Sequence, residues 1–184
     1  ILLPSLRKAK ELAYEVACTS NLHQIGTAWH LYLIDNNDTF PLWTGRMAYF
    51  YGGKHPAILD KESGERESRP LNPYVDMRLQ NESGVGLFRC PVDRAIVCSG
   101  QPSATEGYDT YDYYGNSYRM NWYLLCDWNR ETYTPIWNKP FHFQDVEISN
   151  SQVILAGDCQ WYFSIRDSWW DANFHNYDDR VGML

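Results

Sequence analysis

The sequence lacks an excess of basic side chains and any long apolar run. Its 184 residues hold 16 Lys and Arg against 23 Asp and Glu, for a formal net charge of −7. Nonspecific binding to nucleic acid or to an anionic membrane surface needs basic patches, so the composition argues against both partners. No stretch reaches the roughly 20 apolar residues that a bilayer-spanning helix requires.

Short motifs of common catalytic and metal sites are also missing. The chain has no C-x-x-C pair, no H-E-x-x-H and no G-x-S-x-G. The run Gly84–Gly86 lacks the further glycine of a phosphate-binding loop. We therefore predict that the protein is not an enzyme and carries no cofactor, with calcium as the one ion considered below.

Aliphatic residues are few, whereas aromatic residues are many, with 8 Trp, 14 Tyr and 7 Phe. Such a composition predicts a core built largely from aromatic rings. A second use stays open, because Trp169 and Trp170 are adjacent in an otherwise polar segment. Exposed rings there would stack on sugars, and the protein would then be an exported carbohydrate- or surface-binding module with extracellular polysaccharide as its partner.

The first 38 residues have the pattern of one long helix. We expect it to run from about Pro4 to Asp35, roughly 45–50 Å at 1.5 Å per residue, with a stop signal at Asn36–Asp38. Bulky residues recur with a helical period in its second half. These predicted core residues are Cys18, Leu22, Ile25, Trp29 and Leu33.

Smaller side chains occupy the first half of the same helix. Leu6, Ala9, Ala13 and Val16 are interpreted as continuing the apolar stripe backwards. The change of side-chain size predicts that the second half packs on a domain and that the first half projects away from it.

Weaker strand patterns follow. Alternation predicts strands at 118–125, 152–157 and 160–165, joined as a meander, with weaker strand candidates at 87–90 and 141–148. Residues 99–116 are interpreted as a long loop. An antiparallel sheet with one buried face needs a cover, and the long helix is available to supply it. The expected fold is therefore α+β, a single domain over 1–184, with an N-terminal helix at 1–37 and a globular head at 38–184.

Several ordered segments resemble one bacterial family. Phe88–Asp93 is similar to its F-x-CP-x-D motif, Ser117–Asn121 to SYGMN and Ser151–Asp158 to PS-x-V-x-L-x-x-D. His175 is followed by nine residues, as in the first part of H-x9-DG. In the N-terminal helix and just after it, the matching residues are Leu2, Leu3, Pro4, Leu6, Ala9, Cys18, Asn21, Leu22, Gln24, Ile25, Gly26, Ala28, Tyr32, Phe40 and Pro41.

This set resembles type IV pilin-like proteins, specifically pseudopilins of the G type and the group with a C-terminal H-x9-DG processing-associated domain. The resemblance implies a pilin-like fold and a structural subunit of a type IV pilus or type II secretion-like filament. It also implies prepilin cleavage and methylation, with a leader and an apolar half-helix preceding this sequence as a membrane anchor. The expected partners are homologous subunits and a prepilin peptidase, and the expected location is the bacterial cell envelope with the head in the periplasm or at the cell surface.

The resemblance also assigns residue roles. Leu3, Pro4, Leu6, Ala9 and Ala13 are the implied filament contacts, since small side chains let helices approach closely.

A calcium site near the sheet is implied as well. Asp109, Asp112 and Asn116 offer the oxygen ligands that such an ion prefers. The spacing does not match an EF-hand loop, so a solvated acidic loop stays an alternative.

Cysteine pairing is open on sequence grounds. Two bridges and one thiol can be chosen in 15 ways from the five cysteines, on the assumption that the head lies outside the cytoplasm. Cys18 with Cys90 is the first choice, because both fall within family-like motifs. The alternative that all five are small buried hydrophobes stays equally open. The five are Cys18, Cys90, Cys98, Cys126 and Cys159.

Overall fold

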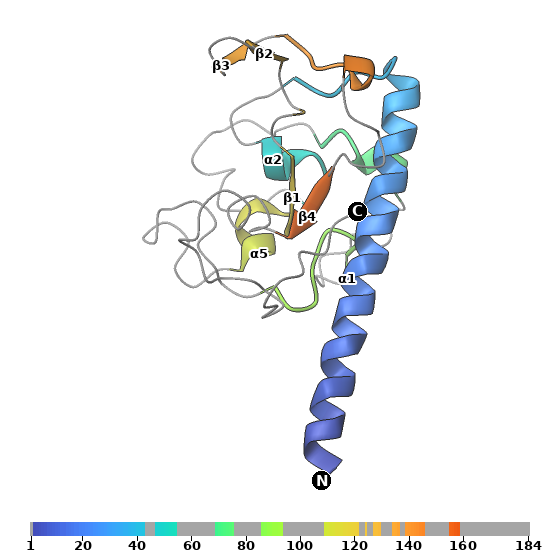
Figure 1. The fold of residues 1–184 in the computed structure, drawn as a ribbon, viewed down its shortest axis with the longest axis vertical. Coiled ribbons are helices and arrows are strands. Elements are labelled where there is room, and N and C mark those ends of the chain that lie inside the picture. Colours follow the sequence, from blue (N-terminus) through green and yellow to red (C-terminus); the bar gives the residue numbers. More distant parts are fainter. Residues whose placement is uncertain are drawn as a thin grey trace.

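A computed structural model gives the protein an α+β architecture, with one long helix beside a smaller head (Figure 1). The residues that it describes are 2–42, 47–54, 69–75, 86–93, 109–121, 124, 127–129, 134–136, 139–145 and 155–158.

The first element, α1, is a single helix over Leu2–Asp35. Its 34 residues span about 50 Å at 1.5 Å per residue, which confirms the predicted helix. Pro4 falls in the first turn, where its missing N–H breaks no helical hydrogen bond. After Asp35 the chain turns through Asn37 and Asp38, whose φ values of 54° and 55° lie in the left-handed region that ends many helices.

Two small antiparallel sheets make up the strands. β1 (Tyr118–Met120) pairs with β4 (Ala156–Asp158), with Tyr118 opposite Asp158 and Met120 opposite Ala156. β4 also lies against α1, and β1 lies against the short helix α2 (Met47–Phe50). The β1–β4 sheet therefore stands between α1 and α2, as Figure 1 shows.

The second sheet is a hairpin of β2 (Asp127–Asn129) and β3 (Thr134–Ile136). The sequence analysis did not predict it, and Pro135 is a residue that sheets admit at edge strands. Proline is tolerated here because the sheet has only two strands, so both are edges. The predicted strand at 160–165 lies outside the described residues.

Several local predictions are wrong. The predicted strand at 118–125 ends at Met120, because the chain turns where Leu124 N–H donates to Asn121 O over 3.1 Å. The pairing of β1 with β4 confirms that the predicted strands 118–125 and 152–157 are antiparallel neighbours, although β4 is placed at Ala156–Asp158. The connection between them is not a short turn, because the separate β2–β3 hairpin lies within it.

Three further segments differ from expectation. Residues 87–90 form a turn, with Arg89 N–H donating to Gly86 O over 3.0 Å. The predicted loop at 99–116 contains a helix, α5 (Thr110–Tyr114), too short to show a 3.6-residue period. In the described part of the predicted strand 141–148, residues 141–145, the chain forms a 3₁₀ turn, η4 (Phe143–Asp145), and an isolated bridge between Thr39 and His142.

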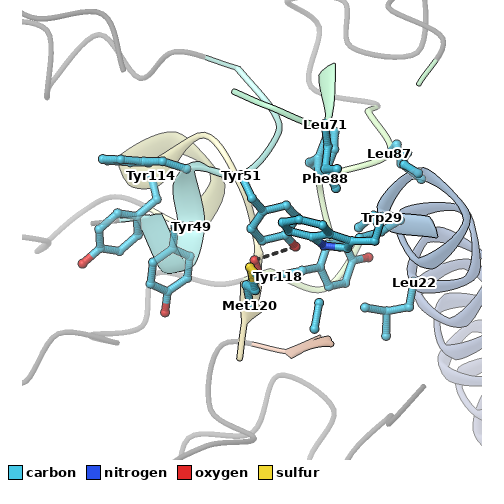
Figure 2. Packing of buried hydrophobic residues seen from close by; sticks show 14 of the residues in the cluster. Leu22, Trp29, Tyr49, Tyr51, Leu71, Leu87, Phe88, Tyr114, Tyr118 and Met120 are labelled. Carbon is cyan, nitrogen blue, oxygen red and sulfur yellow. Dashed lines mark hydrogen bonds between the residues drawn. The ribbon is translucent and has the colours of Figure 1, made fainter. Parts of the chain in front are cut away.

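The core is aromatic, as the composition predicts. The ring of Trp29 on α1 lies 5.4 Å from that of Tyr51 and 5.5 Å from that of Phe40, centre to centre. Tyr51 Oη donates to Tyr118 O over 3.1 Å (dashed in Figure 2), which joins the ring cluster to β1. Leu71 is fully buried in the same cluster, directly before the 3₁₀ turn η1 (Asn72–Tyr74). η1 itself lies against α1.

Next to this cluster, the backbone at Gly53–Lys54 crosses the backbone at Gly115 so closely that no side chain fits between them. Lys54 N–H donates to Gly115 O over 3.1 Å, and a Cβ on Gly115 would lie 1.8 Å from Lys54 O. Gly115 also has φ +77°, a conformation that glycine adopts readily. The buried Arg69 guanidinium donates to the carbonyls of Tyr49, Gly52 and Tyr114 beside this crossing.

Candidate functional site

Four of the residues quoted for the family resemblance, Cys18, Asn21, Cys90 and Tyr118, meet at the junction between α1 and the head. Asn21 Nδ2 on α1 donates to Arg89 O over 3.2 Å and to Tyr118 Oη over 3.1 Å. One turn away, Cys18 Sγ lies 2.6 Å from Cys90 Sγ. Side chains from three distant segments thus fix the helix to the head at one place.

The predicted core residues of α1 are all buried, and Leu22 and Trp29 point from the helix toward the ring cluster (Figure 2). Their exposed fractions confirm the prediction, from 0% for Trp29 to 5% for Leu33. The full set is Cys18, Leu22, Ile25, Trp29 and Leu33.

Asp93 lies within the head, three residues after Cys90, and binds α5 and the residue directly before β1. Its carboxylate accepts hydrogen bonds from Thr110 N–H (3.1 Å), Tyr111 N–H (2.8 Å) and Ser117 Oγ (2.5 Å). Burial raises the pKa of Asp93 to about 6, although these hydrogen bonds act in the opposite direction. The carboxylate therefore caps the first turn of α5, and its burial disfavours the charged form that accepts these hydrogen bonds.

The sequence analysis missed this role, as it missed those of Asn21 and Arg69. Asp93 stands at the end of the C-P-V-D segment, and that motif was the available signal. Its partners Thr110, Tyr111 and Ser117 lie 17 to 24 residues further along the chain, so no local pattern reveals the cap.

The three calcium candidates have protein partners of their own. Asp109 accepts from Asp112 N–H (2.6 Å) and from Arg89 Nη2 (2.9 Å), whereas Asp112 pairs with Lys54 Nζ at 2.6 Å. Lys54 is the main cause that lowers the pKa of Asp112. Asn116 is fully buried, and its Oδ1 accepts from Tyr118 N–H.

These contacts tie Asp109 and Asp112 to each other and to Arg89 and Lys54, whereas Asn116 is bound among backbone groups. In the described part of the chain, no three His, Cys, Asp or Glu side chains converge as a metal site would require. The calcium site stays a prediction without structural support.

The N-terminal half of α1 carries a row of exposed apolar side chains. Leu3 is 81% exposed, Leu6 68% and Val16 69%, and residues 3–13 are all exposed. Figure 1 shows why, since these turns extend beyond the described part of the head. The predicted projecting half is confirmed.

The prediction that these side chains continue the core stripe is wrong. Val16 precedes Cys18 by two residues, which is a rotation of about 200° at 3.6 residues per turn. The core stripe instead runs back into Glu11 and Arg7, which form an exposed ion pair at 3.0 Å. The apolar row therefore lies on the side of α1 that faces away from the head.

The same side of α1 stays exposed along the whole helix, at alternating spacings of three and four residues, but after Val16 it is polar until Ile34. We call it the outward face of α1, and it consists of Leu6, Ala9, Ala13, Val16, Ser20, His23, Thr27, His30 and Ile34. Every one of these residues is exposed. The 3-4 spacing is that of residues which meet a neighbouring helix in coiled coils.

The middle of the outward face borders an open hollow of about 570 Å³. Among the described residues, its lining runs along α1 from Glu15 to Thr27 and is polar apart from Val16. The described lining residues are Glu15, Val16, Thr19, Ser20, His23, Gln24 and Thr27.

Within the described residues, no helix combines the length and apolar character needed to cross a bilayer.

The described aromatic rings give the sugar-stacking hypothesis no visible platform. Among residues whose exposure is described, the large exposed apolar side chains are all aliphatic. Trp169 and Trp170, which that hypothesis singled out, lie outside the described residues.

Known proteins add no assignment to this site. Comparisons with protein-family models, with curated proteins and with solved structures gave no match. The site is therefore defined by its own geometry, a junction that fixes α1 to the head and an outward face on the opposite side of the same helix.

Proposed function

We propose that the protein is a structural subunit of a pilin-like filament, of the type IV pilus or type II secretion kind. The observation that carries the proposal is the outward face of α1. Its first half presents the exposed apolar side chains Leu6, Ala9, Ala13 and Val16 with helix-packing spacing, on the side opposite the head. A neighbouring copy of α1 is the partner that such a face fits, because small residues allow close helix approach.

The junction supports the same proposal. Asn21 donates to Arg89 O and Tyr118 Oη, and these contacts position α1 against the head. In a filament, helices of successive subunits would pack at the centre while heads form the exterior. A prepilin peptidase would process the precursor, and an N-terminal apolar segment would anchor the subunit in the bacterial cytoplasmic membrane before assembly, with the head in the periplasm or at the cell surface.

The test expresses this chain behind a prepilin leader and an apolar segment of about 20 residues, in bacteria with and without a prepilin peptidase. Cleavage ahead of the apolar segment, in the peptidase strain alone, and association with the membrane fraction are the expected results. An uncleaved product or a precursor that stays out of the membrane contradicts the proposal.

A second arm tests the outward face itself. A photo-crosslinking amino acid at Ala13 should give crosslinks between copies, and the same amino acid at Leu42 should not. Leu42 is a matched control, because it is apolar and 46% exposed but lies beyond the helix. Equal crosslinking from both positions would refute helix-mediated assembly.

A further inference from the structure

Two cysteines from distant parts of the chain meet inside the junction. Cys18 lies on α1 and Cys90 in the turn at 86–93, and they are 72 residues apart in the sequence. Their exposed fractions are 4% and 1%, and their sulfur atoms are 2.6 Å apart. A disulfide has a sulfur–sulfur bond of about 2.05 Å, so a small movement of the side chains brings the two atoms to bonding distance.

Other contacts hold both cysteines in place independently of their sulfur atoms. Asn21 Nδ2 donates to Arg89 O, directly before Cys90, and Ser117 N–H donates to Phe88 O over 2.8 Å. Leu22, one turn after Cys18, is 4% exposed. The helix and the turn are therefore fixed on both sides of the pair, so their juxtaposition follows from the fold of the whole junction.

We propose that Cys18 and Cys90 form a disulfide bond that fastens α1 covalently to the head. The oxidant is a disulfide compound, either an oxidised thiol–disulfide oxidoreductase or a small molecule such as oxidised glutathione. This bond concerns the chain alone and does not depend on filament assembly.

The bond forms in two exchange steps. The thiolate of one cysteine attacks a sulfur of the oxidant, which forms a mixed disulfide and releases one thiol of the oxidant. The second thiolate attacks the mixed disulfide at the first cysteine's sulfur, forms the Cys18–Cys90 bond and releases the other thiol. The two cysteines lose two electrons and two protons in total, and the oxidant gains them.

Burial decides when this exchange takes place. In the folded protein both sulfur atoms are shielded from a bulky oxidant or reductant, and exchange rates depend on access. The bond therefore closes while the head docks on α1, and the finished junction protects it afterwards. Reduction should require unfolding of the junction.

The test is a peptide map of the full chain, refolded in a mixture of reduced and oxidised glutathione. After free thiols are blocked with an alkylating reagent, mass spectrometry under non-reducing conditions should find a Cys18 peptide linked to a Cys90 peptide. In the native protein, a mild reductant should open the bond at least tenfold more slowly than in urea. Alkylated Cys18 and Cys90 in the refolded protein, or bonds from either to another cysteine, would overturn the proposal.

Variants give a second measurement. Cys18→Ala and Cys90→Ala should each lower the melting temperature of the oxidised protein by about 5–15 °C, and the double variant should lower it little further. The control Cys98→Ala should keep the linked peptide. Additive losses in the double variant would show two separately packed thiols and refute the bond. The peptide map needs only the natural chain, so it decides the question even where a variant fails to fold.

Discussion

The two halves of α1 use the same kinds of residue for different purposes. Trp29 is completely buried, whereas Leu6, on the same helix, is 68% exposed. Val16 and Cys18 differ in the same way although only two residues separate them. Hydrophobicity alone therefore does not decide burial on this helix. Burial depends on whether a residue's position around the helix axis turns it toward the head. Residues 3–13, which lie beyond the described part of the head, are exposed on every side of the helix.

The largest expected effect separates the buried half from the projecting half. Trp29→Ala should lower the free energy of unfolding by about 3–5 kcal/mol, because it removes a ring from the centre of the core. Leu6→Ala should change it by less than about 0.5 kcal/mol. Urea denaturation followed by circular dichroism measures both, and similar losses from the two variants would break the comparison.

A pH series should show the titration of Asp93 in the head. The pKa of Asp93 is raised to about 6 from its ordinary 3.8. Between these pH values the folded state holds a proton that the unfolded state has lost, so stability should fall as pH rises, by about 2 kcal/mol in all.

Thermal denaturation from pH 4 to pH 7 measures this slope. Asp93→Asn should flatten it, and Leu6→Ala should leave it unchanged. A slope that persists in Asp93→Asn would assign the titration to another group.

At the junction, one side chain should matter more than its neighbour on the helix. Asn21→Ala removes the hydrogen bonds to Arg89 O and Tyr118 Oη and should cost about 1–2 kcal/mol. Gln24→Ala is the matched control, because Gln24 is exposed and donates only locally, to Ser20 O at 3.4 Å. Equal effects on the urea midpoint would show that the junction contacts contribute nothing specific.

The smallest expected effect concerns the helix backbone. A Cβ at Gly26 would meet nothing within 4 Å, so Gly26→Ala should stabilise the protein by about 0.5–1 kcal/mol. Ala13→Gly changes the same propensity in the projecting half. It should reduce the helical signal without moving the unfolding midpoint, because that half has no contact with the described head. A shift of the midpoint by Ala13→Gly would show that the two halves unfold together.

Sequence reasoning found the long helix because its signals are local and repeated. A period of 3.6 residues over many turns, and the stop after Asp35, both lie within one segment. The core face was found for the same reason. The outward face was assigned to the wrong side, because the small side chains were joined to the core stripe without following the 200° rotation between Val16 and Cys18.

The head was harder to predict because its order comes from contacts between distant segments. β1 and β4 have three residues each, too few for alternation to mark their ends, and their pairing joins positions almost 40 residues apart. Asp93 and Arg69 bind backbone groups, which have no sequence signature. The motif residues marked the right segments, but their roles as partners of one another appear only once the chain is folded.

The continuity of α1 has a mechanical consequence. A pull on its first turns is transmitted through the unbroken first half of the helix to the level of Cys18 and Asn21. The contacts there lie across the helix axis, so an axial load would act on them in shear and would be shared among them, with no single contact peeled away first. Tension applied to the projecting half of α1 would thus be distributed over all the contacts that join the helix to the head.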